Sequence, residues 1–363
     1  MVKQQPPPIF TDAPISASSF DALARLPVAQ RLLELVMIAS ELPLVIALVG
    51  AAGDGKSSVL QMAGELCATR GDLRAFAIDA WAAGDAAKVG EVFLREVSQI
   101  FEEERVVGKM DKARDRLIEL GDYVSAVVRF AGVKVDVKGA LEKSPDQLRT
   151  EVLKLTEAIG KRIVVFVDHL DRLAPADGVA VLKLIARWGA FPYFAFVLGI
   201  DRDQMVRNLR RIDGDADDLD RHVAVELPMP PVDRAELAGW IRGGMNDLAA
   251  ALGCDPTGAL TLFDVETGVG LSFVQTLRQA KRLLNALSAA LPLAGATVDL
   301  RAACLIEMVR VFTPDAFPIV IDRLPLAIDD AGRARLAAEL APIAARHRRP
   351  DAAKALFTSL TPA

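Results

Sequence analysis

Short apolar runs alternate along the first two thirds of the chain with stretches in which apolar residues recur every three or four positions. The runs predict strands at 44–49, 73–78, 163–167, 193–200 and 223–227. The runs at 44–49, 163–167 and 193–200 are expected to be buried, and the run at 163–167 is continuously apolar and β-branched. The periodic stretches predict helices at 21–40, 56–70, 87–104, 178–188 and 206–211. Strands that alternate with helices in this way predict an α/β fold, with a parallel sheet covered on both faces.

The pattern changes after Pro228, Pro230 and Pro231, because every later apolar pattern has helical spacing. Helices are predicted at 234–252, 258–266, 272–291 and 298–312, followed by short helices. We therefore expect an extended N-terminal lead at 1–20, a sheet domain at 21–231, a helical domain at 232–314 and a helical C-terminal tail at 315–363. An insertion at about 102–141 interrupts the sheet domain, and its mixed pattern does not settle its structure.

Composition narrows the class of protein. The chain has 363 residues, 52% of them hydrophobic and 25% charged, which is enough for a sizeable core and an ordinary polar surface. A net charge of -5 argues against a globally basic nucleic-acid binder. Three scattered cysteines and three histidines favour neither disulfides nor a histidine metal site. The longest apolar run, 42–52, is far short of the roughly 20 residues of a membrane helix, so we expect a cytoplasmic protein without an integral membrane segment.

The first predicted strand leads directly into a glycine-rich loop and a helix. The loop has the pattern G-x-x-x-x-G-K-S, which predicts a phosphate-binding loop. Glycines permit backbone conformations that a Cβ would hinder, and the loop N–H groups and the start of the helix converge on phosphate oxygens. Lys56 is expected to contact the β- and γ-phosphates, and the Ser57 hydroxyl is expected to bind Mg²⁺. The predicted nucleotide-binding residues are Gly50, Gly53, Asp54, Gly55, Lys56, Ser57 and Ser58.

Polar residues follow two later strands at the edge where ligands bind in open α/β folds. Asp168 ends the 163–167 run and is the predicted second Mg²⁺ ligand. His169 and Asp171 are alternative candidates for activating the attacking water. Asp201 ends the 193–200 run, where it reaches the γ-phosphate or the attacking water, or else caps the following helix.

One face of a helix in the predicted helical domain is basic. Arg278, Lys281 and Arg282 share this face because they are spaced i, i+3, i+4. Such a helix, presented to the phosphates, would sense the state of the nucleotide, and Arg278 is the residue predicted to do so.

These pieces together resemble the KAP P-loop NTPases. The resemblance rests on the lead D-x-x-x-R-x-P-x-A from Asp21 to Ala29, the phosphate loop, Ala80-Trp81, Asp168-His169-Leu170-Asp171-Arg172, Phe196 to Arg202, and Leu277 to Asn285. It implies a sheet of strand order 5-1-4-3-2 (the ASCE division), ATP as the nucleotide and a C-terminal helical lid. The chain departs from the family pattern at His169, where the family has a second Asp, and at Leu277, where it has Pro. The insertion lacks the membrane helices that many relatives carry.

The leading hypothesis is a Mg²⁺-dependent ATPase that switches a homo-oligomer or signals to a separate effector protein. Bacterial members of the family are associated with phage and plasmid defence. An arginine among Arg202, Arg207, Arg210 and Arg211 could reach an adjacent protomer, or these residues form a solvated helix face.

Two alternatives remain. One is an ATP-binding scaffold that hydrolyses little, because His169 stands where the family has an acid. The other is a nucleic-acid-associated motor, which would use the basic cluster of Arg346, His347, Arg348, Arg349 and Lys354.

Overall fold

The computed structural model describes residues 9–11, 13–14, 21–38, 43–104, 156–157, 159–189, 191–212, 219–294, 299–327 and 329–360. By their internal contacts, the residues form two compact units. The sheet unit is Pro14–Pro230, and the helical unit combines Met1–Ala13 with Pro231–Ala363. The predicted insertion at about 102–141 lies almost wholly outside the described residues.

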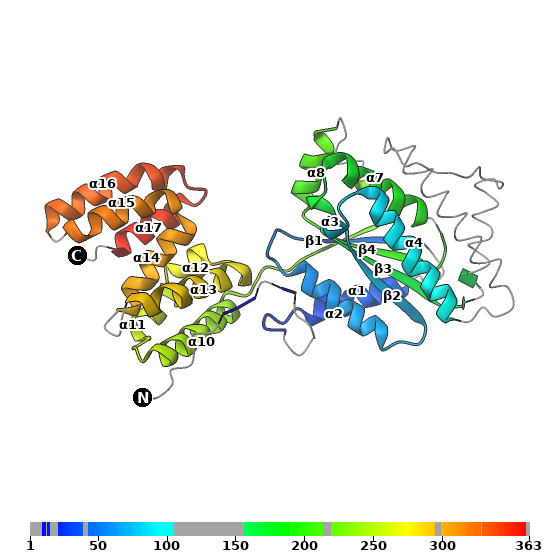
Figure 1. The fold of residues 1–363 in the computed structure, drawn as a ribbon, viewed down its shortest axis with the longest axis horizontal. Coiled ribbons are helices and arrows are strands. Elements are labelled where there is room, and N and C mark those ends of the chain that lie inside the picture. Colours follow the sequence, from blue (N-terminus) through cyan, green and yellow to red (C-terminus); the bar gives the residue numbers. More distant parts are fainter. Residues whose placement is uncertain are drawn as a thin grey trace. The chain divides into compact units, whose positions relative to one another are not determined.

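The sheet unit is built on five parallel strands in the order β2-β3-β4-β1-β5 (Figure 1). The strands are β1 (Leu44–Val49), β2 (Leu73–Asp79), β3 (Arg162–Asp168), β4 (Phe194–Ile200) and β5 (Val225–Pro228). Read from the other edge, this is the predicted order 5-1-4-3-2, and the predicted fold class is confirmed. Every residue of β4 is buried, as expected of an inner strand whose two faces are covered.

Helices cover both faces of the sheet. On one face, α1 (Leu26–Ile38) and α2 (Lys56–Ala68) pack on apolar side chains that include Ile46, Leu48 and Phe166. The opposite face is covered by α3 (Ala80–Ala83), α4 (Ala86–Glu103), α7 (Pro175–Trp188) and α8 (Arg202–Arg210). A group of aromatic rings forms the core there, with Phe93 4.8 Å from Trp188 and 5.9 Å from Phe196 between ring centroids.

The first helix starts later than its apolar pattern indicates. The predicted helix at 21–40 begins at Leu26, with Pro27 in the first turn, where its missing N–H leaves no bond unmade. The backbone N–H of Leu26 donates a 2.7 Å hydrogen bond to Asp21 Oδ2, so the side chain of Asp21 ends the preceding turn and positions the helix start.

The helical unit contains α10 (Arg234–Leu252), α11 (Thr257–Leu260), α12 (Gly270–Phe273), α13 (Leu277–Ala294), α14 (Leu300–Phe312), α15 (Phe317–Arg323), α16 (Asp330–Arg346) and α17 (Pro350–Leu360). Their buried faces form one hydrophobic cluster. The prediction of a single helix at 272–291 was wrong, because a capping box starts α13. In this box the Thr276 hydroxyl accepts from the Gln279 N–H, while the Gln279 side chain accepts from the N–H groups of Gln275 and Thr276.

The N-terminal segment belongs to the helical unit. Phe10 N–H donates to Asn285 Oδ1 at 2.7 Å, and Asn285 Nδ2 donates back to Phe10 O at 2.8 Å. The ring of Phe10 also packs edge-on against Trp240, with 5.1 Å between centroids. The chain therefore passes between the two units twice, at 13–14 and at 230–231.

No helix of the described part of the chain is long and apolar enough to cross a membrane.

Candidate nucleotide site

The phosphate loop joins the end of β1 to the first turn of α2, so its position is fixed by an inner strand of the sheet. Gly53 and Gly55 adopt left-handed conformations, with φ of 98° and 92°, which glycine adopts without a steric penalty. Lys56 Nζ donates to Gly50 O at 2.8 Å and to Ala51 O at 3.1 Å. The ammonium group thus lies inside the loop that its sequence predicts to hold phosphates.

Three further predicted residues lie in the loop or directly after it. Asp54 Oδ2 accepts a 2.6 Å hydrogen bond from Ala51 N–H, which closes the loop on itself. Ser57 and Ser58 follow Lys56 in the first turn of α2. The first backbone N–H groups of a helix point toward its N-terminal end and are available to an anion. A loop of this shape at a helix start is a ready anion site.

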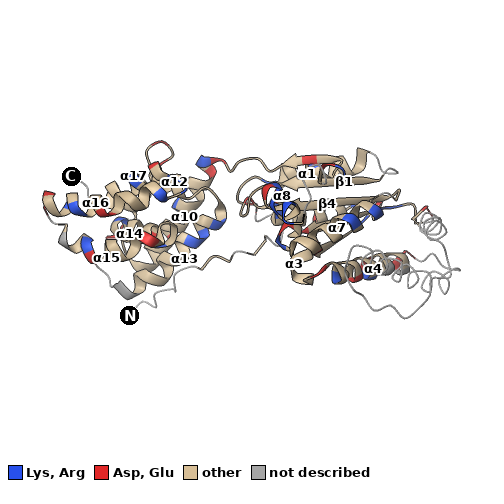
Figure 2. Ribbon diagram, turned by 90° about the horizontal axis from the view of Figure 1, so that it is seen from above, with Lys and Arg blue, Asp and Glu red and all other residues tan. Residues whose placement is uncertain are grey.

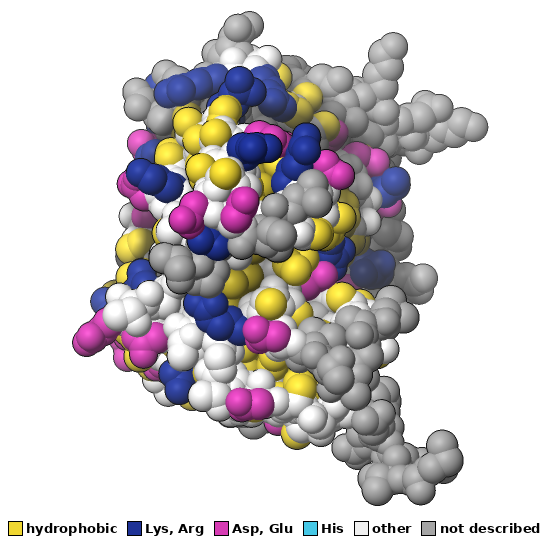
Figure 3. Space-filling model, turned by 90° about the vertical axis from the view of Figure 1, so that its left-hand side faces the viewer, with side chains coloured by type: hydrophobic (Ala, Val, Ile, Leu, Met, Phe, Trp, Pro, Cys, Tyr) yellow, Lys and Arg dark blue, Asp and Glu magenta, His cyan; other side chains and the backbone are white. Residues whose placement is uncertain are grey.

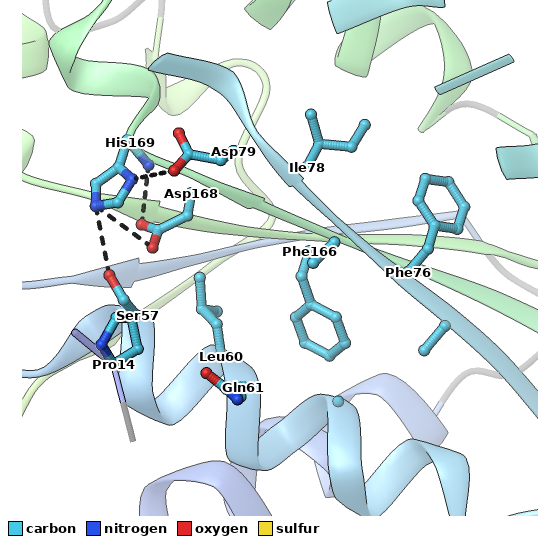
Figure 4. Close-up of a pocket in the computed structure, with 13 residues that line it drawn as sticks. Pro14, Ser57, Leu60, Gln61, Phe76, Ile78, Asp79, Phe166, Asp168 and His169 are labelled. Atoms are coloured by element: carbon cyan, nitrogen blue, oxygen red, sulfur yellow. Dashed lines mark hydrogen bonds and ion pairs between the residues drawn. The ribbon is translucent and has the colours of Figure 1, made fainter. Parts of the chain in front are cut away.

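Four polar side chains meet beside the loop on the α2 side of the sheet (Figure 4). His169 Nε2 lies 3.4 Å from Ser57 Oγ and 3.6 Å from Asp168 Oδ2. His169 Nδ1 lies 3.1 Å from Asp79 Oδ2. Ser57 and Asp168, the predicted Mg²⁺ ligands, are therefore both brought to the same imidazole nitrogen. Hydroxyl and carboxylate oxygens are donors that suit Mg²⁺, so the residues present fit that ion.

These residues form the polar end of a cavity of about 410 Å³. The rest of the cavity is lined mainly by apolar residues of α2, β2 and β3, among them Leu60, Ala75 and Phe166, and Pro14 lies at its edge near Ser57 (Figure 4).

Asp171 lies in a different electrostatic environment. Burial raises the pKa of its carboxyl group, the Lys56 ammonium lowers that pKa, and the Asp201 carboxylate raises it again, so the structure brings Asp171 within electrostatic reach of the loop lysine. Asn208 Nδ2 donates a 2.9 Å hydrogen bond to Asp171 O and fixes the backbone at this point. Asp201 caps α8, since its Oδ1 accepts from Gln204 N–H at 3.0 Å.

The sequence matches a known protein family over most of its length. The KAP family P-loop domain matches residues 25–294, well over half of the chain. The protein belongs to the KAP family.

A curated relative, the Phage T7 exclusion protein of Escherichia coli (strain K12), is 22% identical over 226 residues. The match covers 59% of this chain and 30% of the relative, so the chain spans less than a third of the relative's length. Among solved structures, Cdc6p from Pyrobaculum aerophilum aligns with 12% identity and a TM-score of 0.46, covering 93% of both chains. The ORC2 protein of Aeropyrum pernix aligns with 13% identity and a TM-score of 0.40, covering 98% of this chain and 87% of that one.

The stretch of α13 that resembles a KAP motif, Leu277 to Asn285, is partly engaged within the helical unit. Lys281 Nζ donates to Thr11 O at 2.8 Å, and Asn285 holds Phe10, so both side chains bind the N-terminal segment. Arg278 lies on the same helix and is half-buried. Its predicted role in sensing the γ-phosphate stays a prediction.

In each of the two predicted basic segments, on α8 and near the C-terminus, one arginine interacts with other groups of its own unit. On α8, whose basic residues are visible in Figure 2, Arg202 is paired with Asp220 at 2.6 Å and Glu226 at 2.9 Å. In the C-terminal basic cluster, Arg349 Nη1 donates to the carbonyl oxygens of Ser272 and Phe273 at 3.0 and 3.1 Å. The face of the helical unit in Figure 3 mixes basic, acidic and apolar side chains.

Sequence reasoning missed one residue of the site, Asp79. The available signal was that Asp79 ends an apolar run, as Asp168 and Asp201 also do. Its importance becomes visible only when β2 is paired with β3 and the two carboxylates stand side by side.

Proposed function

We propose that this KAP protein binds ATP together with Mg²⁺ through the phosphate loop and hydrolyses the bond between the β- and γ-phosphates. One observation carries the proposal: three features that hydrolysis requires lie together at the phosphate loop. Lys56 lies within the loop, Ser57 and Asp168 meet at one imidazole nitrogen, and Asp171 is within electrostatic reach of Lys56.

In this proposal Ser57 and Asp168 would hold the Mg²⁺ ion. When bound, Mg²⁺ neutralises charge on the β- and γ-phosphates and so assists departure of the leaving group. Lys56 moves from its contacts with Gly50 O and Ala51 O to the phosphate oxygens. The phosphate oxygens then accept the hydrogen bonds of the Lys56 ammonium group, which the carbonyl oxygens of the loop accept when no nucleotide is bound.

Asp171 is proposed as the residue that activates water. Its carboxylate belongs to the group of charges that includes Lys56, and Lys56 is the residue expected to contact the γ-phosphate. A carboxyl group whose pKa is raised by burial is a stronger base when ionised, so Asp171 is suited to accept a proton from the attacking water. His169 instead faces Ser57 and Asp168, on the side of the proposed ion.

The hydrolysis cycle is proposed to switch an oligomer of this chain or to signal to a separate effector protein. The likeness to the Phage T7 exclusion protein supports a role in excluding phage, although the chain matches only 30% of that relative.

A second candidate is an ATP-binding scaffold that hydrolyses little. The observation that favours it is the placement of His169, whose ring fills the space beside Ser57 and Asp168 directly after the β3 strand. If the protein is a scaffold, this ring blocks the approach of water, and nucleotide binding alone drives assembly.

The deciding experiment measures binding of a fluorescent ATP analogue and release of phosphate by the same preparations. Hydrolysis predicts phosphate release by the wild type, loss of binding and release in Lys56→Ala, and binding without release in Asp171→Asn. Lys88→Ala, a change at an exposed lysine paired with Asp85, serves as the matched control and should behave as wild type.

Two outcomes would favour the scaffold instead. One is wild-type phosphate release no greater than that of Lys56→Ala despite intact binding, and the other is a sharp gain of turnover in His169→Glu. Gel filtration with and without a non-hydrolysable ATP analogue tests the switch. A monomer in both conditions would remove the oligomer from the proposal.

A further inference from the structure

The strand register places two carboxylates and one glycine in a row across the sheet. Asp79 of β2 pairs with Asp168 of β3, and Asp168 pairs with Gly199 of β4. Paired residues of neighbouring parallel strands point to the same face, so Asp79 and Asp168 both project toward α2. Gly199 carries no side chain, and a Cβ there would stand 2.8 Å from Asp168 Oδ1. The row therefore leaves room for one group between the carboxylates and Ser57.

The imidazole ring of His169 occupies that room. His169 has a left-handed backbone with φ of 59°, an uncommon conformation for a residue other than glycine. The backbone N–H of His169 donates to Asp168 Oδ1 at 2.9 Å, which holds the turn in place. This turn directs the ring back over the row instead of away from the sheet (Figure 4). The side chain is only 20% exposed, so it is not a residue of the open surface.

Asp79 determines which nitrogen of His169 carries hydrogen. An ionised carboxylate can only accept hydrogen bonds, so the 3.1 Å contact between Asp79 Oδ2 and Nδ1 requires hydrogen on Nδ1. In the neutral ring the lone pair is then on Nε2, which is the nitrogen near Ser57 Oγ and Asp168 Oδ2. A carboxylate that binds one ring nitrogen while the other faces a metal is the usual arrangement around metal-binding histidines.

We infer that His169 Nε2 is a third protein ligand of the divalent cation held by Ser57 and Asp168, with Asp79 as its positioning residue. Nε2 is 3.4 and 3.6 Å from the two oxygens, close to the spacing of about 3 to 3.5 Å between donors that each lie about 2.1 Å from one ion. The inference rests on the proposed function, because it concerns the ion that accompanies the nucleotide.

An imidazole ligand changes which cation the site prefers. Mg²⁺ favours oxygen donors, whereas imidazole binds first-row transition ions more strongly, with affinity rising from Mn²⁺ to Co²⁺. The site should therefore bind Mn²⁺ and Co²⁺ in clear preference to Mg²⁺. Among the described residues, no three His, Cys, Asp or Glu side chains are placed so that they could hold a metal ion by themselves, so nucleotide phosphates and water would complete the coordination.

The test uses the full chain with a non-hydrolysable ATP analogue, so that no measurement depends on turnover. Binding of the analogue is measured first, then Mn²⁺ and Mg²⁺ affinities by titration, and finally the pulsed electron paramagnetic resonance spectrum of bound Mn²⁺. Wild type should show coupling of Mn²⁺ to an imidazole nitrogen. His169→Ala should lose this coupling and lose about 10- to 100-fold in Mn²⁺ affinity, with a much smaller change for Mg²⁺.

Asp79→Asn separates positioning from folding. Asn can still cap α3, as Asp79 does by accepting from Ala82 N–H at 2.9 Å, but its amide can donate to Nδ1 and so move hydrogen onto Nε2. This variant should lose about 10-fold in Mn²⁺ affinity while its melting temperature stays unchanged. Asp85→Asn, a change at an exposed carboxylate that pairs with Lys88, is the matched control and should keep the Mn²⁺ preference.

The outcomes distinguish failure of the inference about His169 from failure of the proposed function. Normal analogue binding without nitrogen coupling, or equal losses for Mn²⁺ and Mg²⁺ in His169→Ala, would overturn the inference and leave the proposed function standing. A wild-type chain that binds no analogue would overturn both.

Discussion

A Cβ atom added to Gly199 would lie 2.8 Å from Oδ1 of Asp168 and 2.8 Å from Cδ1 of Leu60. The carboxylate proposed to hold the cation therefore depends on the absence of a side chain on the neighbouring strand. Contacts this short force the neighbouring atoms to move.

Gly199→Ala is accordingly expected to displace the Asp168 carboxylate and to weaken divalent-cation binding by about 10-fold. Nucleotide binding measured without a divalent cation should change little, because the phosphate loop lies on another strand. Cation titrations in the presence of a non-hydrolysable ATP analogue check this. Gly243→Ala is the control, since a Cβ there meets nothing within 4 Å and lies in α10. Unchanged cation affinity in Gly199→Ala would contradict the assignment of Asp168.

Asp171→Asn should reduce the rate of phosphate release by about 100-fold or more while leaving nucleotide affinity nearly unchanged. Burial is the main cause of the raised pKa of Asp171, and a base acts only when it is ionised. The wild-type rate should therefore rise with pH through an acidic limb that lies above the range of an ordinary Asp, and the variant should lack this limb. A pH–rate profile that keeps the same limb in Asp171→Asn would assign the base elsewhere.

Asp171 should also lower the stability of the folded protein at neutral pH. A carboxyl group whose pKa is raised in the folded state contributes stability at pH values below its unfolded pKa, and this contribution is lost as pH rises through the folded pKa. At neutral pH the ionised Asp171 carboxylate therefore opposes folding, and Asn carries no such charge. Thermal unfolding at neutral pH should give a melting temperature for Asp171→Asn equal to or above that of wild type, and the difference should shrink at low pH.

Asn285→Ala should destabilise the helical unit by about 1 to 3 kcal/mol, because it removes both hydrogen bonds to the backbone of Phe10. Denaturant unfolding measures the loss of stability, and a separate hydrogen-exchange measurement on α13 locates it. Arg282→Ala changes an exposed side chain of the same helix and should leave stability within about 0.5 kcal/mol of wild type. Equal effects of the two substitutions would mean that the N-terminal segment contributes nothing to the unit.

Arg349→Ala should lower the free energy of unfolding by about 1 to 3 kcal/mol, because the guanidinium binds two backbone carbonyl groups near the end of α12. Arg348→Ala, a change at an exposed neighbour, should have little effect. Chemical denaturation of both variants checks this. A folded and fully stable Arg349→Ala that had lost salt-dependent DNA binding would instead support the nucleic-acid-associated motor.

The inner strands of the sheet could be predicted closely because their residues are buried, as in β3 and β4. The run at 44–49 coincides with β1, since a short unbroken run of apolar and β-branched residues favours a buried strand. The run at 73–78, which contains Arg74, differs from β2 only by Asp79. The predicted phosphate loop is likewise local, because its residues are consecutive. The start of α13 was missed although its signal, Thr276 followed three residues later by Gln279, is present in the sequence.

The contact between His169 and Asp79 could not be predicted in the same way. It depends on which strand lies beside β3 and on the register between them, and those two residues are 90 positions apart. It also depends on the left-handed backbone of His169, which a residue other than glycine seldom adopts. Both are set by packing of the whole sheet rather than by any local pattern.

The return of the N-terminal segment to the helical unit affects the order in which the protein folds as it is synthesised. Phe10 and its partner Asn285 are 275 positions apart, and all strands of the sheet lie between them. At about 5 to 20 residues per second, the ribosome needs roughly 15 to 55 s to make the helix that receives this segment. The sheet unit can therefore fold on the ribosome first, while the segment that precedes it waits for α13 to emerge.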